Sequence, residues 1–282
     1  MDAQMRYGND VIFRTIDKMA ERIHQYAVEP EFAQEIRRRE AEPSFDLDDD
    51  AILKRMILLI AFSQQVRSAI ISDIVHRGVF ERVFLSFCPA DVATIDPKQL
   101  RELYWDNPSK PNERLAPLRF PGKLTSMVEC AKSLQQIASR HGSFMRFLQL
   151  QQLPIRIRSR TDADQFWIAF EKTRLQLTAI GTPFFNKFTS LCHLLQYLGF
   201  DCAKPDSVVM DVGARLGIVA KPATTFPEAD RRTVVQTMQL YSAAKGIRTG
   251  VVDLYFLIHG GQTDAQKYVT PAYYGEVGSL GG

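Results

Sequence analysis

Apolar residues recur every three or four positions along most of this chain, the spacing that gathers them on one face of an α-helix. This periodicity predicts helices at residues 11–27, 30–39, 52–62, 66–75, 79–87, 96–103, 124–138, 144–150, 162–177, 187–198, 207–216, 228–244 and 251–259. Nothing in the pattern is typical of a parallel sheet. We therefore expect an all-α fold.

Polar residues at several helix starts are typical N-caps, since their side chains can accept hydrogen bonds from the first backbone amides. We expect Asp46 and Ser143 to have this role. Asp96-Pro97 should start another helix, because proline is preferred in a first turn. Residues 154–160 alternate apolar and basic side chains, which predicts a short strand or an extended linker. We expect residues 106–122, with four prolines, to form an exposed loop, and residues 260–282 to be loosely ordered.

Composition narrows the class of protein. The 282 residues are 45% hydrophobic and 24% charged, which is ordinary for a globular protein, and they contain no apolar run long enough to span a membrane. The first ten residues lack the apolar core of a signal peptide. The net charge of +3 permits nucleic-acid binding without signalling it. Four scattered cysteines, with no C-x-x-C spacing, favour reduced thiols and argue against a zinc or iron–sulfur site. We expect no cofactor, no metal and no membrane partner.

Two stretches carry the candidate chemistry. In the first, Ser63-Gln64-Gln65 ends an apolar helical run. In the second, an apolar helix starts near Thr189-Ser190, stops at Gly199, and is followed by a short loop and Asp206 at the start of the next helix. In this order, with an amphipathic helix between them, the two stretches resemble the helix-hairpin-helix DNA glycosylases, which remove damaged or mispaired bases from DNA. The resemblance covers about residues 52–260.

The resemblance implies an all-α fold with two helical lobes and a DNA-binding cleft between them. Residues 1–50 would form N-terminal helices packing with the C-terminal lobe, residues 51–203 the central lobe with the hairpin, and residues 204–282 the C-terminal lobe and tail. The implied partner is double-stranded DNA containing a damaged or mispaired base. We expect a monomer in the cytoplasm, associated with the nucleoid if the source is bacterial.

The resemblance also assigns roles to single residues. Asp206 would be the catalytic carboxylate, which offsets positive charge on the sugar or activates a nucleophile. Gln64 or Gln65 would fill the gap left by the extruded base, because an amide both donates and accepts hydrogen bonds. Each assignment has a simpler alternative: Asp206 is also typical of an ordinary N-cap, and two glutamines can merely end a buried helix.

The hairpin before the second helix would hold a DNA phosphate with backbone amides. Where the family has Gly-x-Gly, this chain has Phe184-Phe185-Asn186-Lys187, in which Asn186 can replace the second glycine by adopting left-handed geometry. The implied DNA contacts are Phe185, Asn186, Lys187, Thr189 and Ser190. Phe188 occupies the place of the lysine found in enzymes that also cut the strand, which favours an enzyme without lyase activity.

Tyr104 and Trp105, beside the proline-rich loop, are candidates for stacking on an extruded base. Two other functions fit the same sequence. The chain can be a DNA-binding protein of this fold that has lost catalysis, or an all-helical protein-interaction domain. Salt-sensitive DNA binding separates the first from the second, and base release that depends on Asp206 separates the enzyme from both.

Overall fold

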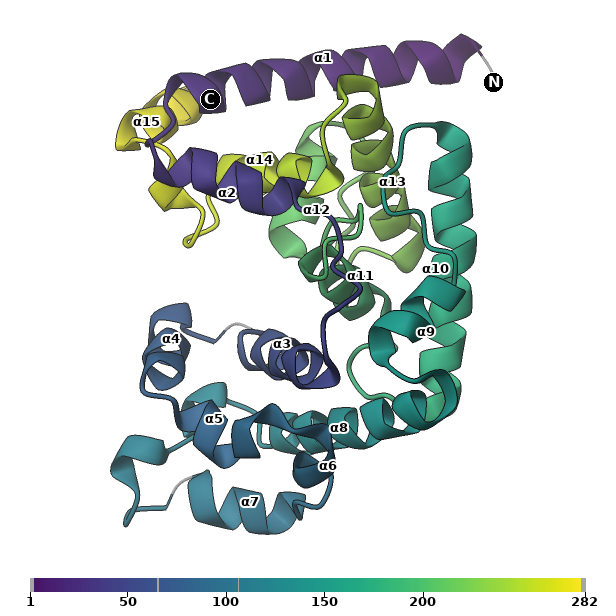
Figure 1. The fold of residues 1–282 in the computed structure, drawn as a ribbon. Coiled ribbons are helices and arrows are strands. Elements are labelled where there is room, and N and C mark those ends of the chain that lie inside the picture. Colours follow the sequence, from purple (N-terminus) through teal and green to yellow (C-terminus); the bar gives the residue numbers. More distant parts are fainter. Residues whose placement is uncertain (1–2, 65, 106, 280–282) are drawn as a thin grey trace. The chain divides into compact units, whose positions relative to one another are not determined.

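The computed structural model describes residues 3–64, 66–105 and 107–279, and these residues form helices joined by short loops (Figure 1). Over these ranges no β-strand forms, and the only β-type pairing is an isolated antiparallel bridge between Ala27 and Val269. The predicted all-α class is confirmed.

The helices divide into two compact units, neither of which is a continuous piece of chain. Unit 1 contains Met1–Pro43, Pro154–Trp167 and Leu198–Gly282, and unit 2 contains Ser44–Leu153 and Ile168–Tyr197. The expected boundaries after residues 50 and 203 lie a few residues from Pro43 and Leu198. The expected central lobe had also included 154–167, which the structure groups with the two ends of the chain.

Unit 1 is built around a helix with almost no exposed face. Its elements are α1 (Ala3–Gln25), α2 (Glu31–Glu40), the first turns of α10 (Arg160–Ile180), α12 (Ser207–Arg215), α13 (Glu228–Lys245), α14 (Thr249–His259), the 3-10 turn η4 (Gln266–Tyr268) and α15 (Pro271–Ser279). Nearly every residue of α14 is buried, because α1, α2, α12 and α13 all pack against it. A helix that is apolar all round is stable only in such a central position.

Unit 2 contains the remaining elements. They are α3 (Asp49–Ala61), α4 (Ser68–His76), α5 (Val79–Val83), η1 (Leu85–Phe87), α6 (Pro89–Val92), α7 (Pro97–Tyr104), η2 (Pro111–Glu113), η3 (Ala116–Leu118), α8 (Gly122–His141), α9 (Phe144–Leu150), the rest of α10 and α11 (Phe188–Tyr197). Helix α3 packs along α8 and also contacts α9 and α11 (Figure 1). Leu53, Met56, Leu124 and Met127 are fully buried in this core. Burying each such side chain contributes about 1.5–3 kcal/mol.

Of the two predicted caps, Ser143 is confirmed and Asp46 is not, and the helix predicted to start at Asp96-Pro97 is also present. Asp96 Oδ1 accepts a hydrogen bond from the Lys98 amide at 2.9 Å, and Ser143 Oγ accepts one from the Arg146 amide at 3.1 Å. The prediction for Asp46 is wrong: α3 begins at Asp49 and is capped by Asp48, which accepts from the Ala51 amide at 2.7 Å. Three consecutive aspartates make the cap ambiguous in sequence, and only the register of the buried apolar face selects one.

The predicted helix at residues 79–87 is shorter than expected. Helix α5 stops at Val83, since Leu85, Ser86 and Phe87 have φ values of 46°, 56° and 66°. Positive φ is incompatible with a right-handed helix. Phe84 and Phe87 are still buried there, whereas Leu85 is exposed.

The prediction that residues 260–282 are loosely ordered is wrong for the described part of that segment. Tyr273 of α15 is fully buried, and its hydroxyl shares a 2.9 Å hydrogen bond with His259 Nδ1. Backbone amides also connect the segment to the N-terminal region: Val28 donates to Tyr268 O at 2.9 Å and Thr270 donates to Tyr26 O at 2.9 Å. The tail therefore belongs to the core of unit 1.

Residues 154–159 form a linker with bends at Ile155 and Arg156 rather than a strand, and α10 begins at Arg160. The buried carboxylate of Asp201 accepts a hydrogen bond from the Ile157 amide at 2.9 Å and one from the Thr249 amide at 2.6 Å. A side chain thus supplies the partner that a neighbouring strand would have supplied. Among the arginines of the linker, Arg156 donates to Gly246 O at 2.6 Å.

Candidate functional site

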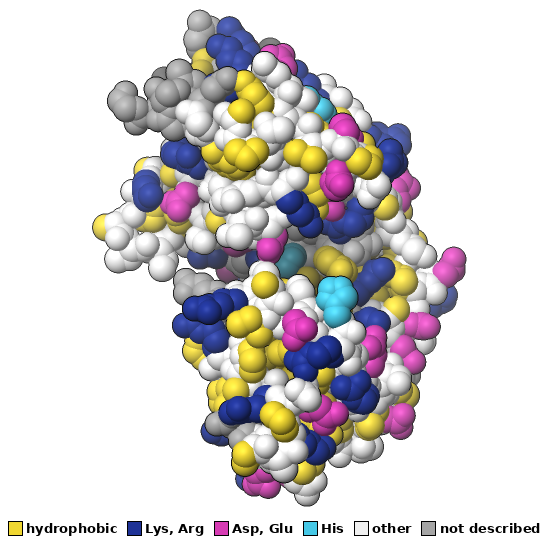
Figure 2. Space-filling view, turned by 90° about the vertical axis from the view of Figure 1, so that its left-hand side faces the viewer, with side chains coloured by type: hydrophobic (Ala, Val, Ile, Leu, Met, Phe, Trp, Pro, Cys, Tyr) yellow, Lys and Arg dark blue, Asp and Glu magenta, His cyan; other side chains and the backbone are white. Residues whose placement is uncertain are grey.

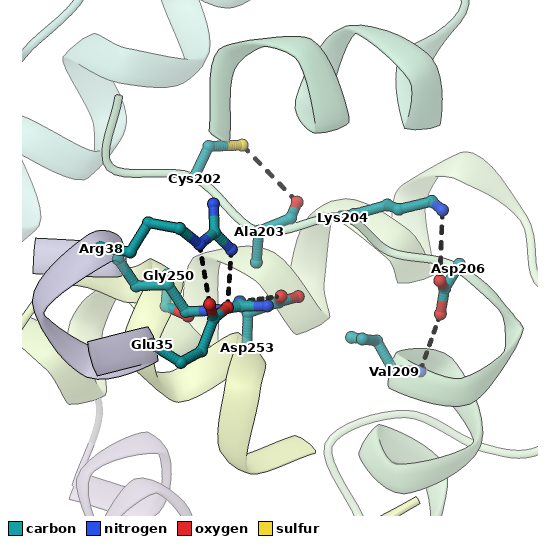
Figure 3. A network of polar contacts seen from close by, with 10 residues as sticks. Glu35, Arg38, Cys202, Ala203, Lys204, Asp206, Val209, Gly250 and Asp253 are labelled. Carbon is teal, nitrogen blue, oxygen red and sulfur yellow. Dashed lines mark hydrogen bonds and ion pairs between the residues drawn. The ribbon is translucent and has the colours of Figure 1, made fainter. Parts of the chain in front are cut away.

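Asp206 lies in unit 1 as the N-cap of α12. Its backbone is extended, with φ −82° and ψ −178°, and its Oδ1 accepts hydrogen bonds from the Val208 and Val209 amides at 3.1 and 3.2 Å (Figure 3). The capping role considered from sequence is therefore present. Both bonds end on the same oxygen, so the cap fixes the carboxylate in one orientation.

The second oxygen of Asp206 has different surroundings. Oδ2 lies 3.5 Å from Nζ of Lys204, and the Asp206 side chain is 27% exposed (Figure 3). The backbone before it is held by Arg231, which donates to Phe226 O at 3.1 Å and to Pro205 O at 3.4 Å. The carboxylate is thus anchored through one oxygen and accessible to solvent.

The predicted hairpin lies in unit 2, between α10 and α11. Helix α10 ends at Ile180, Gly181 takes a φ of 82°, and the Thr182 amide donates to Leu177 O at 2.9 Å. This left-handed glycine with a backward hydrogen bond is a common way to end a helix. Seven residues then connect to α11, so the hairpin is longer than a Gly-x-Gly turn.

At the tip of this hairpin the left-handed residue is Phe184, with φ 64°, and not Asn186 as expected. Phe185 is fully buried and packs edge to face on Phe184, with ring centroids 5.1 Å apart. Its side chain therefore serves the core, and Phe185 can meet DNA only through its backbone. The aromatic pair explains how a bulky residue is kept in a conformation that usually favours glycine.

The start of α11 carries the remaining hairpin candidates. Asn186, Thr189 and Ser190 are partly exposed and Lys187 is exposed. The first amides of a helix have no partner within it, and they point along the axis toward a site that favours anions. Phe188 is buried against Phe170, with ring centroids 5.2 Å apart, so Lys187 and not residue 188 presents an amine at this end.

Gln64 lies in unit 2, in the turn that follows α3. Its side chain is exposed and its φ is 59°. Ser63 Oγ closes the helix end by donating to Ile60 O at 2.6 Å. The other predicted gap-filling residue, Gln65, lies outside the described residues.

A buried lysine holds this turn. From sequence, Lys123 is expected beside the exposed proline-rich loop, within reach of a DNA backbone, and that expectation is wrong. Lys123, in the first turn of α8, is 4% exposed, and its Nζ donates to Ser63 O at 2.7 Å and to Ala61 O at 3.3 Å. A lysine beside a glycine at a helix start is most often a solvated charge. Only the packing of α3 on α8 reveals where its amine lies.

Tyr104 and Trp105 end α7 and are both partly exposed. The Tyr104 ring is covered by Lys110, whose Nζ lies 4.4 Å from the ring centroid and 3.4 Å from the hydroxyl. A base can stack on this face of Tyr104 only if Lys110 moves. Stacking at Trp105 remains a prediction.

Other charged groups of unit 1 form a structural cluster. Glu35 accepts hydrogen bonds from Arg38 and Arg39, and Arg39 Nη1 lies 2.7 Å from Asp253 Oδ2 (Figure 3). Although burial opposes it, contact with the two arginines lowers the pKa of Glu35 to about 2. The cluster therefore joins α2 to α14 through ion pairs between two carboxylates and two arginines.

The surface shows no broad basic face in the view of Figure 2, where lysines and arginines lie in small groups with acidic and apolar side chains between them. Nowhere in the described ranges do three or more His, Cys, Asp or Glu side chains come together as metal ligands. Among the described helices, none is both long and apolar enough to cross a bilayer.

No protein-family model matches this chain, and no curated protein or solved structure matches it either. Its function is therefore inferred from its own residues.

Proposed function

We propose that this protein is a monofunctional DNA N-glycosylase that excises a damaged or mispaired base, with Asp206 as its catalytic carboxylate. The observation that carries the proposal is the unequal use of the two Asp206 oxygens. Oδ1 takes both amide hydrogen bonds of the cap, whereas Oδ2 is beside Lys204 in a side chain that is 27% exposed. An anchored carboxylate with an accessible oxygen suits a reaction in which positive charge develops on a sugar.

In the proposed reaction the target base leaves the duplex stack, which costs a few kcal/mol. The bond between the anomeric carbon and the base nitrogen then breaks, and its electron pair leaves with the base. Asp206 offsets the positive charge on the sugar. A water molecule forms the new bond to the anomeric carbon, and Asp206 Oδ2 accepts its proton. A fixed orientation favours such a step because the charge needs no reorganisation as the reaction proceeds.

The two units have separate roles in this proposal. Unit 1 supplies Asp206, and unit 2 supplies the grip on the DNA. The start of α11 binds a backbone phosphate, with exposed Lys187 as an additional cation. Gln64 is also assigned to DNA binding by unit 2. It is exposed at a helix end, and its side-chain amide can pair with the base left without a partner.

The proposal excludes a lyase step at the hairpin. An amine that forms a Schiff base must reach the anomeric carbon of the sugar. Phe188 is buried where that lysine would be, and a shift of one residue to Lys187 turns a helical side chain by about 100°. Lys187 is therefore assigned to phosphate binding.

One observation favours a second function, a DNA-binding protein without catalysis. Phe184 holds the hairpin position where glycine would let a phosphate approach most closely, and the cap alone already gives Asp206 a structural reason to be there. Both functions predict affinity for duplex DNA that falls as salt rises. They differ only in base release.

A panel of duplexes tests the proposal, each with one alkylated, oxidised, deaminated or mismatched base. We expect the wild type to release at least one of these bases and Asp206→Asn to release none. Asparagine is also a good N-cap, so the variant keeps the fold. Binding to an abasic-site duplex without release of any base would leave the DNA-binding function. Neither release nor binding would exclude both and leave a protein-interaction domain.

A further inference from the structure

Lys123 has an unusual position for a charged side chain. It belongs to the first turn of α8, is 4% exposed, and has its amine inside unit 2 rather than in solvent. Lysine is almost never fully buried unless its charge has partners. The burial of Lys123 therefore requires a physical explanation.

Three effects oppose a protonated amine at this place. Burial removes its water, Arg119 repels it, and the start of a helix carries partial positive charge. The first two lower the pKa of Lys123 to about 8. If Lys123 contributed only the packing of its apolar stem, its amine could turn outward into solvent and avoid these costs.

The hydrogen-bond acceptors of the Lys123 amine lie at the C-terminal end of a helix, α3. Nζ donates to Ala61 O at 3.3 Å and to Ser63 O at 2.7 Å, at the C-terminus of α3. Carbonyls at a helix C-terminus lack partners within the helix and carry partial negative charge. Lys123 thus donates to two carbonyls at this helix end, and it joins the start of α8 to the end of α3.

The contact ends one residue before Gln64. The Phe62 amide donates to Leu58 O at 3.0 Å and the Ser63 amide to Ile60 O at 3.2 Å, so the chain is helical or nearly so up to Ser63. It then leaves the helix at Gln64, whose backbone φ is 59°. Residues other than glycine adopt such a positive φ infrequently. A hydrogen bond to Ser63 O fixes the peptide plane that joins Ser63 to Gln64, because that carbonyl and the Gln64 amide belong to the same rigid unit.

We propose that Lys123 is a positioning residue that fixes the turn after α3 and so holds Gln64 in the conformation that fills the gap left by an extruded base. This inference rests on the proposed function, since it assigns Lys123 a part in DNA distortion and not in the chemical step. The alternative is that Lys123 only stabilises unit 2. The two differ in whether the effect of Lys123 passes through Gln64.

The test is a double-mutant cycle on Lys123→Met and Gln64→Ala. Methionine keeps much of the apolar stem and removes the amine. The probe is a duplex with a tetrahydrofuran abasic-site analogue opposite 2-aminopurine, whose fluorescence reports contact with the orphaned base. Lys132→Met is the matched control, because Lys132 is on the same helix and is 41% exposed beside Glu129. Lys123→Arg tests whether a cation that can donate to both carbonyls restores the effect.

We expect Lys123→Met to weaken binding to this duplex about tenfold and to reduce the fluorescence change. Lys132→Met should leave both unchanged, and Lys123→Arg should recover most of the affinity. The double variant should bind no more weakly than Gln64→Ala alone, because coupled residues are not additive. Additive losses, a Lys123→Met variant equal to wild type, or no recovery by arginine would each overturn the inference.

Hydrogen exchange of the amides in residues 62–67 provides a readout that needs no DNA. Lys123→Met should speed their exchange relative to the rest of unit 2, whereas loss of the whole fold would speed exchange throughout. Unchanged exchange in this segment would overturn the claim that Lys123 holds the turn. If the wild type fails to bind the duplex, the proposed function fails and the role of Gln64 with it, and the exchange result shows separately whether Lys123 fixes the turn.

Discussion

The two oxygens of Asp206 allow one side chain to stabilise a helix and still be available for chemistry. Capping requires an acceptor for the first amides, and Oδ1 alone satisfies two of them. Catalysis by the proposed route requires a negative charge at a fixed place, which the cap itself provides. The two roles therefore do not compete, and substitutions can separate them.

Substitution of Asp206 should affect stability according to its capping ability. Asp206→Ala removes both hydrogen bonds and should lower the free energy of unfolding by about 1 kcal/mol. Asp206→Asn keeps an acceptor and should lie close to wild type. Urea unfolding measures both. If Asp206→Asn lowered the free energy of unfolding as much as Asp206→Ala, the cap would depend on the charge. Asp206→Asn could then no longer test catalysis separately from stability.

Lys123 should make stability rise with pH above neutrality. Its pKa is lowered from 10.5 in the unfolded chain to about 8, so between these values the unfolded chain binds more protons than the folded protein. The free energy of unfolding therefore increases from about pH 8 toward pH 10.5 and is constant for this group below that window. The difference between wild type and Lys123→Met in urea unfolding should show the rise. The same difference for Lys132→Met should be flat, and a flat profile for Lys123 as well would contradict the lowered pKa.

Residue-scale features divide into those that sequence could predict and those that it could not. Ser143 is predicted as a cap, and capping is one of the two roles considered for Asp206, because the next two or three residues contain everything that a cap needs. The role of Lys123 could not be predicted, since its partners are carbonyls about 60 residues earlier in the chain. The left-handed Phe184 was missed for a related reason: its cost is offset by packing against Phe185 rather than by a local preference.

At the scale of elements, the hairpin between α10 and α11 presents a helix start whose nearest exposed cation is Lys187. The proposal predicts that this end binds a phosphate without reading the base sequence. Lys187→Gln should weaken binding about equally for all duplexes and reduce the slope of log affinity against log salt by about 1.

Lys172→Gln is the matched control for Lys187, because Lys172 is an exposed lysine of α10 within unit 2. It should change neither affinity nor slope. Equal slopes for wild type and Lys187→Gln would remove this lysine from the DNA contact.

The C-terminal segment is an element that sequence patterns did not predict correctly. Its helix α15 has only nine residues, too few for a helical period to distinguish it from a loop. Order comes instead from long-range contacts, above all from Tyr273. Tyr273→Ala should lower the free energy of unfolding by about 3 kcal/mol because it empties a fully buried site.

Tyr273→Phe separates packing from hydrogen bonding in the same site. It removes only the hydroxyl that bonds to His259 Nδ1, and should cost about 1 kcal/mol. Thermal or urea unfolding of the two variants measures the difference. A negligible effect of the alanine variant would contradict the docking of the tail and favour the loosely ordered segment predicted from sequence.

At the scale of the whole molecule, the chain alternates between two units and crosses between them four times, once within α10. Helical periodicity predicted most of the helices but not this grouping, because the assignment of residues 154–167 to unit 1 depends on contacts such as the Asp201 carboxylate with the Ile157 amide. The candidate residues follow the same division. Asp206 is in unit 1, and Gln64 and the hairpin are in unit 2.

Single-turnover base release tests the central claim most directly, on the duplex that the wild type processes best. We compare wild type, Asp206→Asn and Asp211→Asn, since Asp211 is a 47% exposed aspartate on the same helix, paired with Lys221. The account predicts that Asp206→Asn slows release by roughly a hundredfold or more while it still binds the duplex, and that Asp211→Asn behaves as wild type. Release by Asp206→Asn at the wild-type rate would contradict the account and leave Asp206 as a helix cap alone.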